Sequence, residues 1–250
     1  MKVLLKPLQW IYSLYAIIMF VATMLIVFLF VIAASFFGKI KGGNFVYKVC
    51  KAWGYTWYTL VGMRHKSIYE VPHDQGRQYI FLANHISYID IPAAMVSINQ
   101  PMRILAKYEM SKVPVFGFIY RYATILVDRT DAEKRAHSIR EMKSFIHKHI
   151  SIFIYPEGTF NETETPLKEF FDGAFRIAIE TQTPLKPILF IDTVDRLHYS
   201  SIFSFTPGLC RTVFLQEVPV AGLKMTDVNM LKQKVFSMME EGLRRYRTYL

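Results

Sequence analysis

Hydrophobic residues follow two different patterns along this chain. Residues 10–37 are almost unbroken Leu, Ile, Val, Phe, Met and Ala, and no charged residue occurs between Pro7 and Gly38. From Tyr79 onward, short apolar runs alternate with stretches in which apolar residues recur at helical spacing. The change of pattern predicts an N-terminal membrane segment followed by a domain of alternating strands and helices.

The first apolar segment is longer than the roughly 20 residues that a helix needs to cross a bilayer. Lys2 and Lys6 precede it, as in a signal peptide, but the apolar run is too long for one and "IAASFF" is a poor cleavage site. We therefore expect an uncleaved anchor. More basic residues follow the anchor than precede it, which predicts that the rest of the chain lies on the cytoplasmic face of a membrane; they are Lys39, Lys41, Lys48, Lys51, Arg64 and Lys66.

A second apolar segment, "NFVYKVCKAWGYTWYTLVG" at residues 44–62, contains two lysines and four clustered aromatic residues. Lys48 and Lys51 make it a poor spanning helix, so we expect it to lie at the level of the lipid headgroups and to pack against the anchor. "GKIKGG" would form the turn between the two helices. The expected division of the chain is residues 1–66 for the anchor and interfacial helix, and residues 67–250 for the α/β domain. The clustered aromatic residues are Trp53, Tyr55, Trp57 and Tyr58.

The second part of the chain is expected to fold as α/β, with a mostly parallel sheet flanked by helices. The clearest helix is 131–149, which opens with the capping-box pattern "TDAE" and places Ile139, Met142 and Ile146 on one stripe. A last helix is expected over residues 227–249. The expected strands are residues 79–83, 102–106, 125–128, 150–155, 185–191 and 212–215.

The composition of the chain indicates whether it binds a membrane surface or nucleic acid. The chain has 250 residues, of which 52% are hydrophobic and 20% charged, with a net charge of +10. A basic and apolar chain fits an anionic membrane surface better than nucleic acid, because nucleic-acid binders carry less aliphatic surface. Cys50 and Cys210 show neither zinc-site nor disulfide spacing, which indicates a reducing compartment. No metal site is expected, since His137, His147 and His149 fall on one solvated helix face.

Polar residues follow several of the expected strands. "NHISYID" follows the first, "KYE" at residues 107–109 the second, "DR" at 128–129 the third and "PEGTF" at 156–160 the fourth. The carboxyl ends of parallel strands meet at one edge of a sheet, where α/β proteins place their sites. These residues are therefore expected to converge on a functional site.

His85 and Asp90 in "NHISYID" are candidates for acid–base chemistry. On a helix their offset would point them about 140° apart, so we expect His85 in the strand-to-helix loop and Asp90 as the N-cap of a helix that includes Pro92. A carboxylate bonded to one ring nitrogen makes the other a competent base. Because no G-x-S-x-G motif is present, the histidine would act on a substrate hydroxyl. A purely structural hydrogen bond is the alternative.

The order and spacing of five blocks resemble the glycerolipid acyltransferases, and among them the bacterial 1-acylglycerol-3-phosphate acyltransferases. The blocks are "NHISYID", "AKYEM" (106–110), "PVFGFIYRYATILVDR" (114–129), "YPEGTF" (155–160) and "TPLKPILF" (183–190). The resemblance covers residues 79 to about 191. It implies a membrane enzyme that needs no cofactor and uses acyl-CoA or acyl carrier protein as co-substrate.

The resemblance also implies a role for each block. His85 would deprotonate the free hydroxyl of 1-acylglycerol 3-phosphate for attack on the acyl thioester, and Asp90 would orient His85. The substrate-binding residues implied around the acceptor phosphate are Lys107, Arg129, Glu157, Gly158 and Thr159.

Two positions depart from the family pattern. Phe160 stands where the family has an arginine, so a phosphate ligand is missing or replaced by Lys168 or Arg176. Ala123–Thr124 stands where the family has a glycine. Another lysophospholipid, glycerol 3-phosphate or an amino-acid lipid therefore stays open as the acceptor. A non-catalytic lipid-binding protein is disfavoured, because it has no need of a base such as His85.

Overall fold

The computed structural model describes residues 2–128 and 131–247, and it contains a seven-stranded sheet in the order β1-β7-β6-β2-β5-β3-β4. Strands β6, β2, β5, β3 and β4 run parallel, whereas β7 is antiparallel to β6 and pairs in parallel with β1. The carboxyl ends of five strands therefore share one edge. The strands are β1 Met63–Tyr69, β2 Ile80–Ala83, β3 Met102–Lys107, β4 Thr124–Val127, β5 Ser151–Ile154, β6 Leu185–Phe190 and β7 Gly208–Phe214.

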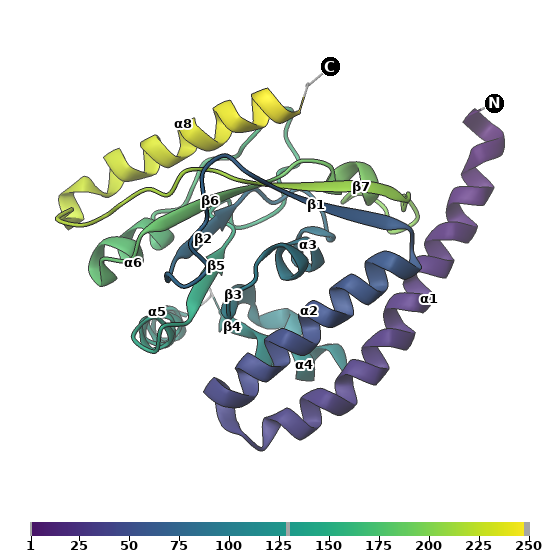
Figure 1. Cartoon of the computed structure of the whole chain (residues 1–250), viewed down its shortest axis with the longest axis horizontal. Helices are drawn as coiled ribbons and strands as arrows, with labels where there is room; N and C mark the ends of the chain where they lie inside the picture. The colour runs from purple at the N-terminus through teal and green to yellow at the C-terminus, as the bar shows by residue number, and fades with distance from the viewer. Residues whose placement is uncertain (1, 129–130, 248–250) are drawn as a thin grey trace.

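Helices cover both faces of the sheet (Figure 1). Helices α5, α6 and α8 pack on one face, and α1 to α4 lie on the other. This arrangement confirms the α/β class expected from the sequence. The helical elements are α1 Lys2–Ser35, η1 Gly38–Gly42, α2 Gly43–Leu60, α3 Asp90–Ser97, η2 Tyr108–Lys112, α4 Phe116–Ala123, α5 Ala132–Ile146, α6 Gly173–Thr181, α7 Thr193–Arg196, η3 Met225–Asp227 and α8 Val228–Tyr246.

All the expected strands are present, but β1 was not expected. Its sequence, "MRHKSIY", is polar because β1 is an edge strand that leaves Arg64 and Lys66 exposed. Charged residues on an edge strand prevent pairing with other chains. Residue 66, the expected boundary between anchor and α/β domain, lies within this strand, and the division of the chain stays a prediction.

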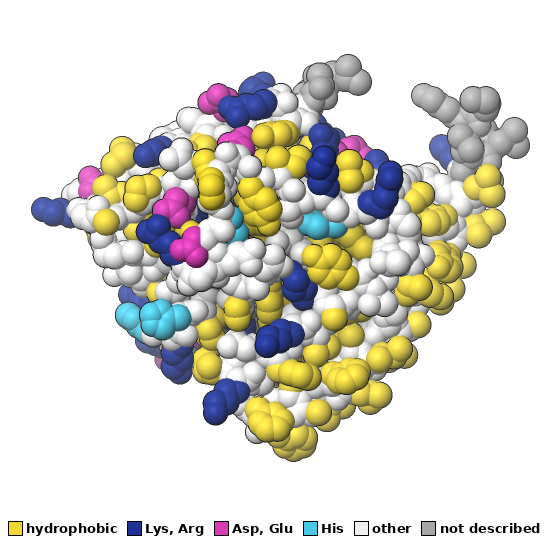
Figure 2. Space-filling model, in the orientation of Figure 1, with side chains coloured by type: hydrophobic (Ala, Val, Ile, Leu, Met, Phe, Trp, Pro, Cys, Tyr) yellow, Lys and Arg dark blue, Asp and Glu magenta, His cyan; other side chains and the backbone are white. Residues whose placement is uncertain are grey.

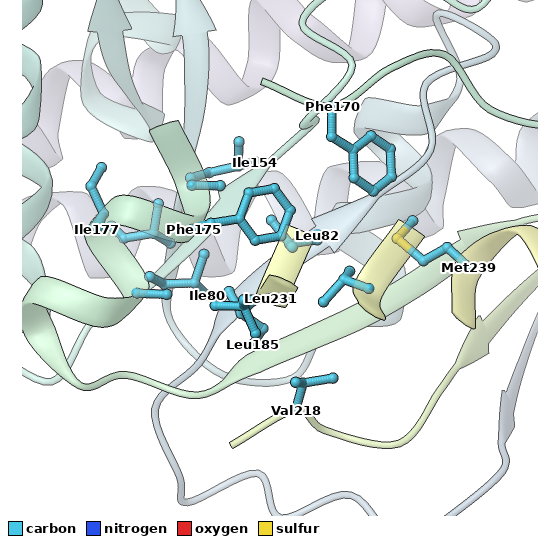
Figure 3. Packing of buried hydrophobic residues seen from close by; sticks show 14 of the residues in the cluster. Ile80, Leu82, Ile154, Phe170, Phe175, Ile177, Leu185, Val218, Leu231 and Met239 are labelled. Carbon is cyan, nitrogen blue, oxygen red and sulfur yellow. The ribbon is translucent and has the colours of Figure 1, made fainter. Parts of the chain in front are cut away.

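Apolar packing on the α5, α6 and α8 face forms the largest single cluster of the core (Figure 3). Phe175 of α6 and Leu231 of α8 pack here on strand residues such as Leu82. Gly242 lets α8 approach the sheet closely, since a Cβ there would lie 2.7 Å from a methyl carbon of Leu189.

Helix α5 differs from the sequence expectation in two details. Met142 and Ile146 are buried, but Ile139 is 38% exposed, because only a narrow stripe of α5 meets the sheet. Asp131 is the N-cap, and its side chain accepts a hydrogen bond from the Glu133 amide. Thr130, which opens the expected capping box, lies outside the described residues.

The N-terminal helices α1 and α2 form a hairpin through η1, as expected from "GKIKGG" (Figure 1). The hairpin is more deeply packed than expected. Trp57 is buried and donates a hydrogen bond to the Ala16 carbonyl, Trp53 donates one to the Thr23 hydroxyl, and Tyr58 is also buried. These aromatic rings attach α2 to α1 and to the domain, as expected of a helix that packs against the anchor, and the position of α2 at the level of the headgroups stays a prediction.

The outward face of α1 is apolar and exposed (Figure 2). The most apolar 18-residue stretch of Lys6–Ser35 has a mean hydropathy of 3.1, and 22% of that stretch is buried, so the helix is long and apolar enough to cross a membrane by length and composition. The exposed side chains include Trp10, Ile11, Leu14, Ile18, Leu25, Leu29 and Phe30.

Arg103 of β3 holds the hairpin to the sheet. Its buried guanidinium donates to the Asn44 side chain at 2.9 Å and to the Lys39 carbonyl at 3.1 Å, and it lies 5.2 Å from the centre of the Phe145 ring. Burial lowers the pKa of Arg103 to about 10, which leaves it protonated at neutral pH. A buried cation therefore connects the turn of the hairpin to the middle of the fold.

Candidate active site

The loop between β2 and α3 is fixed first by Asn84. The Asn84 side chain donates to the Phe190 carbonyl at 3.0 Å and accepts from the Phe190 amide at 2.8 Å. These two hydrogen bonds continue the pairing of β2 with β6 past the end of the strand. The loop that follows thus leaves the sheet at a defined point.

His85 and Asp90 meet within this loop, as the sequence suggested. The His85 ring nitrogen Nδ1 lies 2.9 Å from Asp90 Oδ2, and the amides of Ile86 and Ser87 donate to the same oxygen at 2.7 and 2.8 Å. Asp90 is completely buried, whereas the His85 side chain is 16% exposed. With Nδ1–H held by the carboxylate, Nε2 is the nitrogen left to accept a proton.

Asp90 is not the N-cap that the sequence predicted. Ile89 occupies that position, and Asp90 is the first residue of α3. Its carboxylate turns back toward the loop, where two amides and the imidazole converge on it. The three hydrogen bonds that the Asp90 carboxylate accepts within the loop stabilise this orientation more than one hydrogen bond to the N-terminus of α3 would.

Glu157 holds the same loop from the other side. Its carboxylate accepts hydrogen bonds from the His85 amide and from the Lys168 amide, both at 2.9 Å, and its side chain is buried. Burial raises the pKa of Glu157 to about 7, against the lowering effect of the two amide donors. Both oxygens face backbone amides, an arrangement different from that expected of a residue that binds phosphate.

Aromatic rings enclose the His85 imidazole. The Tyr155 ring stacks on it with centroids 3.9 Å apart, and the Phe160 ring lies 4.3 Å away at a tilt of 57°. Phe160 in turn contacts Tyr88 at 4.8 Å and Tyr199 at 6.4 Å. We call Tyr88, Phe160 and Tyr199 the aromatic wall.

Sequence reasoning did not identify Tyr88, Tyr155 or Tyr199. Tyr88 and Tyr155 stand inside the quoted blocks "NHISYID" and "YPEGTF", which was a usable signal. Tyr199 belongs to none of those blocks, and only the fold brings it to Phe160.

Lys168 is the cation that the fold brings to the turn before Phe160. Its Nζ donates to the Thr159 hydroxyl at 2.7 Å and lies 3.4 Å from the Phe160 carbonyl. Gly158 adopts φ of +74°, a conformation that favours glycine and shapes this turn. Arg176, the other expected replacement for the family arginine, lies on α6 and pairs with Asp172 at 3.7 Å.

The remaining candidates are less defined. Lys107 ends β3 at the same edge of the sheet and is exposed. Arg129 lies outside the described residues. Across residues 2–128 and 131–247, no group of three His, Cys, Asp or Glu side chains is placed to hold a metal ion. His137, His147 and His149 are exposed as expected, but they do not share one helix face, because α5 ends at Ile146 with His147 as its C-cap and His149 lies beyond it.

Comparison with protein-family models shows which family the chain belongs to. The family model described as Acyltransferase matches residues 64–191, which include His85, Asp90 and Glu157. The chain belongs to the acyltransferase family. Together with the apolar helix α1, membership of this family indicates association with a membrane.

Curated relatives carry more specific names. The 1-acyl-sn-glycerol-3-phosphate acyltransferase of Cocos nucifera is 33% identical over 116 residues, which cover 46% of this chain and 37% of that protein. The enzyme of the same name from Escherichia coli is 27% identical over 166 residues, covering 66% of each chain. The alpha enzyme of Ovis aries is 28% identical, with 64% of this chain and 56% of that protein covered. The matched region thus spans little more than a third of the length of the coconut protein and little more than half of the length of the sheep protein.

A crystal structure supports the fold over nearly the whole chain. The 1-acyl-sn-glycerophosphate (LPA) acyltransferase PlsC of Thermotoga maritima superposes with a TM-score of 0.73, covering 98% of this chain and 97% of that one. At 23% sequence identity this likeness concerns the fold alone. It includes the N-terminal helices, which lie outside the region that the family model matches.

Proposed function

We propose that this chain transfers a fatty acyl group from acyl-CoA or acyl carrier protein to the free hydroxyl of 1-acylglycerol 3-phosphate, giving phosphatidic acid. The observation that carries the proposal is the 2.9 Å contact between His85 and the buried Asp90, inside the region that matches the acyltransferase family. The names of the coconut, sheep and E. coli relatives support the acceptor.

In the proposed reaction, His85 takes one proton from the acceptor hydroxyl and passes it to the leaving thiolate. His85 Nε2 takes the proton of the acceptor hydroxyl as its oxygen attacks the thioester carbonyl carbon. Asp90 stabilises the imidazolium that forms. The carbon–sulfur bond then breaks, and the leaving thiolate takes the proton from His85. A new ester and a free thiol result, and the enzyme returns to its starting state.

The acceptor phosphate would bind beside the turn at residues 157–160. Lys168 supplies a positive charge there through its contact with Thr159, and the Gly158 turn exposes backbone amides that suit an anion. Lys107 at the same edge of the sheet, together with Arg129, completes the proposed set of cations. In this proposal Glu157 positions His85 and does not bind phosphate directly.

The enzyme would act at the cytoplasmic face of a membrane, because basic residues follow α1 in excess and are attracted to the anionic lipids of the cytoplasmic leaflet. Gln9 donates to the Ser204 carbonyl at 3.1 Å, and Phe28 contacts Phe118 with centroids 5.5 Å apart. These contacts attach α1 to the α/β domain over about 28 Å of helix, nearly the thickness of the hydrocarbon core. A spanning α1 would draw the domain into the bilayer, so we propose that α1 inserts its exposed face into one leaflet.

Phe160 favours a second candidate, the same chemistry on a different acceptor. An aromatic ring lies 4.3 Å from His85, where the family has a guanidinium that would attract phosphate. A lysophospholipid with a zwitterionic headgroup or an amino-acid lipid would need that cation less.

An acyl-transfer assay distinguishes these candidates. The purified full chain in detergent is offered palmitoyl-CoA with lysophosphatidate, glycerol 3-phosphate, a lysophosphatidylcholine or an amino-acid lysolipid, and the products are separated. Phosphatidic acid should dominate, and His85→Ala should lower the rate by about 10²–10⁴-fold. His147→Ala, on the solvated face of the chain, is the matched control and should keep the rate. Exclusive transfer to another acceptor would establish the second candidate, and transfer that survives His85→Ala would overturn the mechanism.

A further inference from the structure

The loop between α7 and β7, residues 197–207, joins the membrane helix to the active site. On one side it contacts α1: besides the bond from Gln9 to Ser204, the Phe205 amide donates to the Ser13 hydroxyl at 3.1 Å. The Phe205 ring lies 5.5 Å from Trp57, a residue of the hairpin. The loop is therefore anchored at the N-terminal half of α1.

On its other side, the same loop contacts the catalytic loop. The Ser87 hydroxyl donates to the Leu197 carbonyl at 2.6 Å. Tyr199 forms the outer part of the aromatic wall, against Phe160, and Phe160 touches His85. A continuous row of contacts thus leads from α1 through this loop to the imidazole.

The tip of the loop is apolar and exposed. Ile202 is 53% exposed and Phe203 is 44% exposed, and they are neighbours in the sequence. The sequence of the loop, "LHYSSIFSFTP", contains no Asp, Glu, Lys or Arg. Serine residues hold the tip in shape, since the Ser204 hydroxyl donates to the Ser201 carbonyl at 2.6 Å and accepts from the His198 amide at 2.8 Å.

These features fit a lipid surface. Two large exposed apolar side chains in an uncharged loop are costly in water, and insertion into a bilayer removes them from it. They stand one residue before the segment that binds α1, whose exposed residues Leu8 and Ile11 are equally apolar. The loop tip thus directly precedes the residues that hold the loop against α1.

We propose that the α7–β7 loop is a second membrane contact, in which Ile202 and Phe203 insert into the leaflet beside α1. The aromatic wall then faces the bilayer surface, and the lipid acceptor reaches His85 along Tyr199 and Phe160. The membrane contact stands on its own, whereas the route of the acceptor rests on the proposed acyl transfer.

Site-specific fluorescence tests the contact. Cys50 and Cys210 are buried, so Phe203→Cys in the full chain provides one accessible thiol for a nitrobenzoxadiazole dye. With vesicles of phosphatidylglycerol and phosphatidylethanolamine, we expect a blue shift and quenching by brominated lipid. Ile11→Cys on α1 should respond in the same way, whereas Met230→Cys, 53% exposed on α8, should not. A response at residue 11 without one at residue 203 would overturn the proposal, as would no response at either.

Kinetics test the route. The double variant Ile202→Ser with Phe203→Ser should transfer to lysophosphatidate in vesicles about tenfold more slowly than wild type. Its rate with a water-soluble short-chain acceptor, and the rates of Met230→Ser with both acceptors, should stay within about twofold. Equal losses on both acceptors would show that the loop only supports the fold. If wild type transfers to no acceptor, the proposed function fails while the fluorescence result still decides the membrane contact.

Discussion

Replacement of Glu157 by glutamine should change how stability depends on pH. The Glu157 carboxyl is buried, and its pKa is raised from 4.5 to about 7. A raised pKa means that the folded protein prefers the protonated form, so its stability contribution is present at low pH and is lost as pH rises through 7. Between pH 5 and pH 8 the two pKa values give a loss of about 2–3 kcal/mol in the free energy of unfolding. Glutamine does not titrate and should show no such loss.

Thermal unfolding of the two proteins in detergent measures this difference. For a chain of this size, 1 kcal/mol corresponds to about 2–4 °C, so Tm of wild type minus Tm of Glu157→Gln should fall by about 5–10 °C from pH 5 to pH 8. Other titrating groups are common to both proteins and cancel. A difference that stays constant, or that grows toward pH 8, would refute the reasoning. It would show that the amides of His85 and Lys168 stabilise the carboxylate by more than burial destabilises it.

Three further substitutions test the site and its support. Asp90→Asn should fold, because an amide oxygen can accept the same hydrogen bonds. Its kcat for acyl transfer should nevertheless drop by about 10²–10⁴-fold. Activity within a few-fold of wild type would limit Asp90 to a structural role. Phe160→Arg should raise the ratio of kcat/KM for lysophosphatidate over that for a zwitterionic lysolipid, whereas parallel losses with a lower Tm would show that Phe160 mainly packs against His85. Arg103→Lys should lower Tm by about 4–12 °C, since lysine cannot reach Asn44 and the Lys39 carbonyl together. The kcat of the folded enzyme should change little. An unchanged Tm would contradict the role of Arg103 in holding the hairpin.

The strands of the central sheet were predictable because each contains a run of mainly apolar residues, most of them buried. Runs such as residues 80–83 and 185–190 are completely buried, and a buried parallel strand needs no alternation of polar residues. β1 escaped prediction for the opposite reason, since it pairs with β7 on one side only and carries charges. Its position in the sheet depends on a partner far along the chain, which no local pattern reveals.

The His85–Asp90 pair was predictable from the loop, but the supports around it were not. A short loop between a strand and a helix forces its residues together, and an imidazole and a carboxylate then bond. Glu157 and Tyr155 lie in a block whose resemblance suggested phosphate binding, and only the fold shows that Glu157 faces two amides. The N-cap expected at Asp90 was wrong because sequence spacing cannot show which way a carboxylate turns.

Different residues around His85 are expected to support the acyl-transfer reaction and to select the acceptor. His85 is fixed by Asp90 at its ring, by Glu157 at its backbone and by Tyr155 at its face, and Asp90, Glu157 and Tyr155 are all buried. Phe160 approaches the same ring and Tyr199 stacks on Phe160, on segments that also carry Lys168 and the apolar loop tip. Substitutions in the buried set should therefore lower turnover for every acceptor. Substitutions in the aromatic wall should instead change the ranking of acceptors, because we propose that the wall lies between the base and the membrane from which a lipid acceptor would arrive.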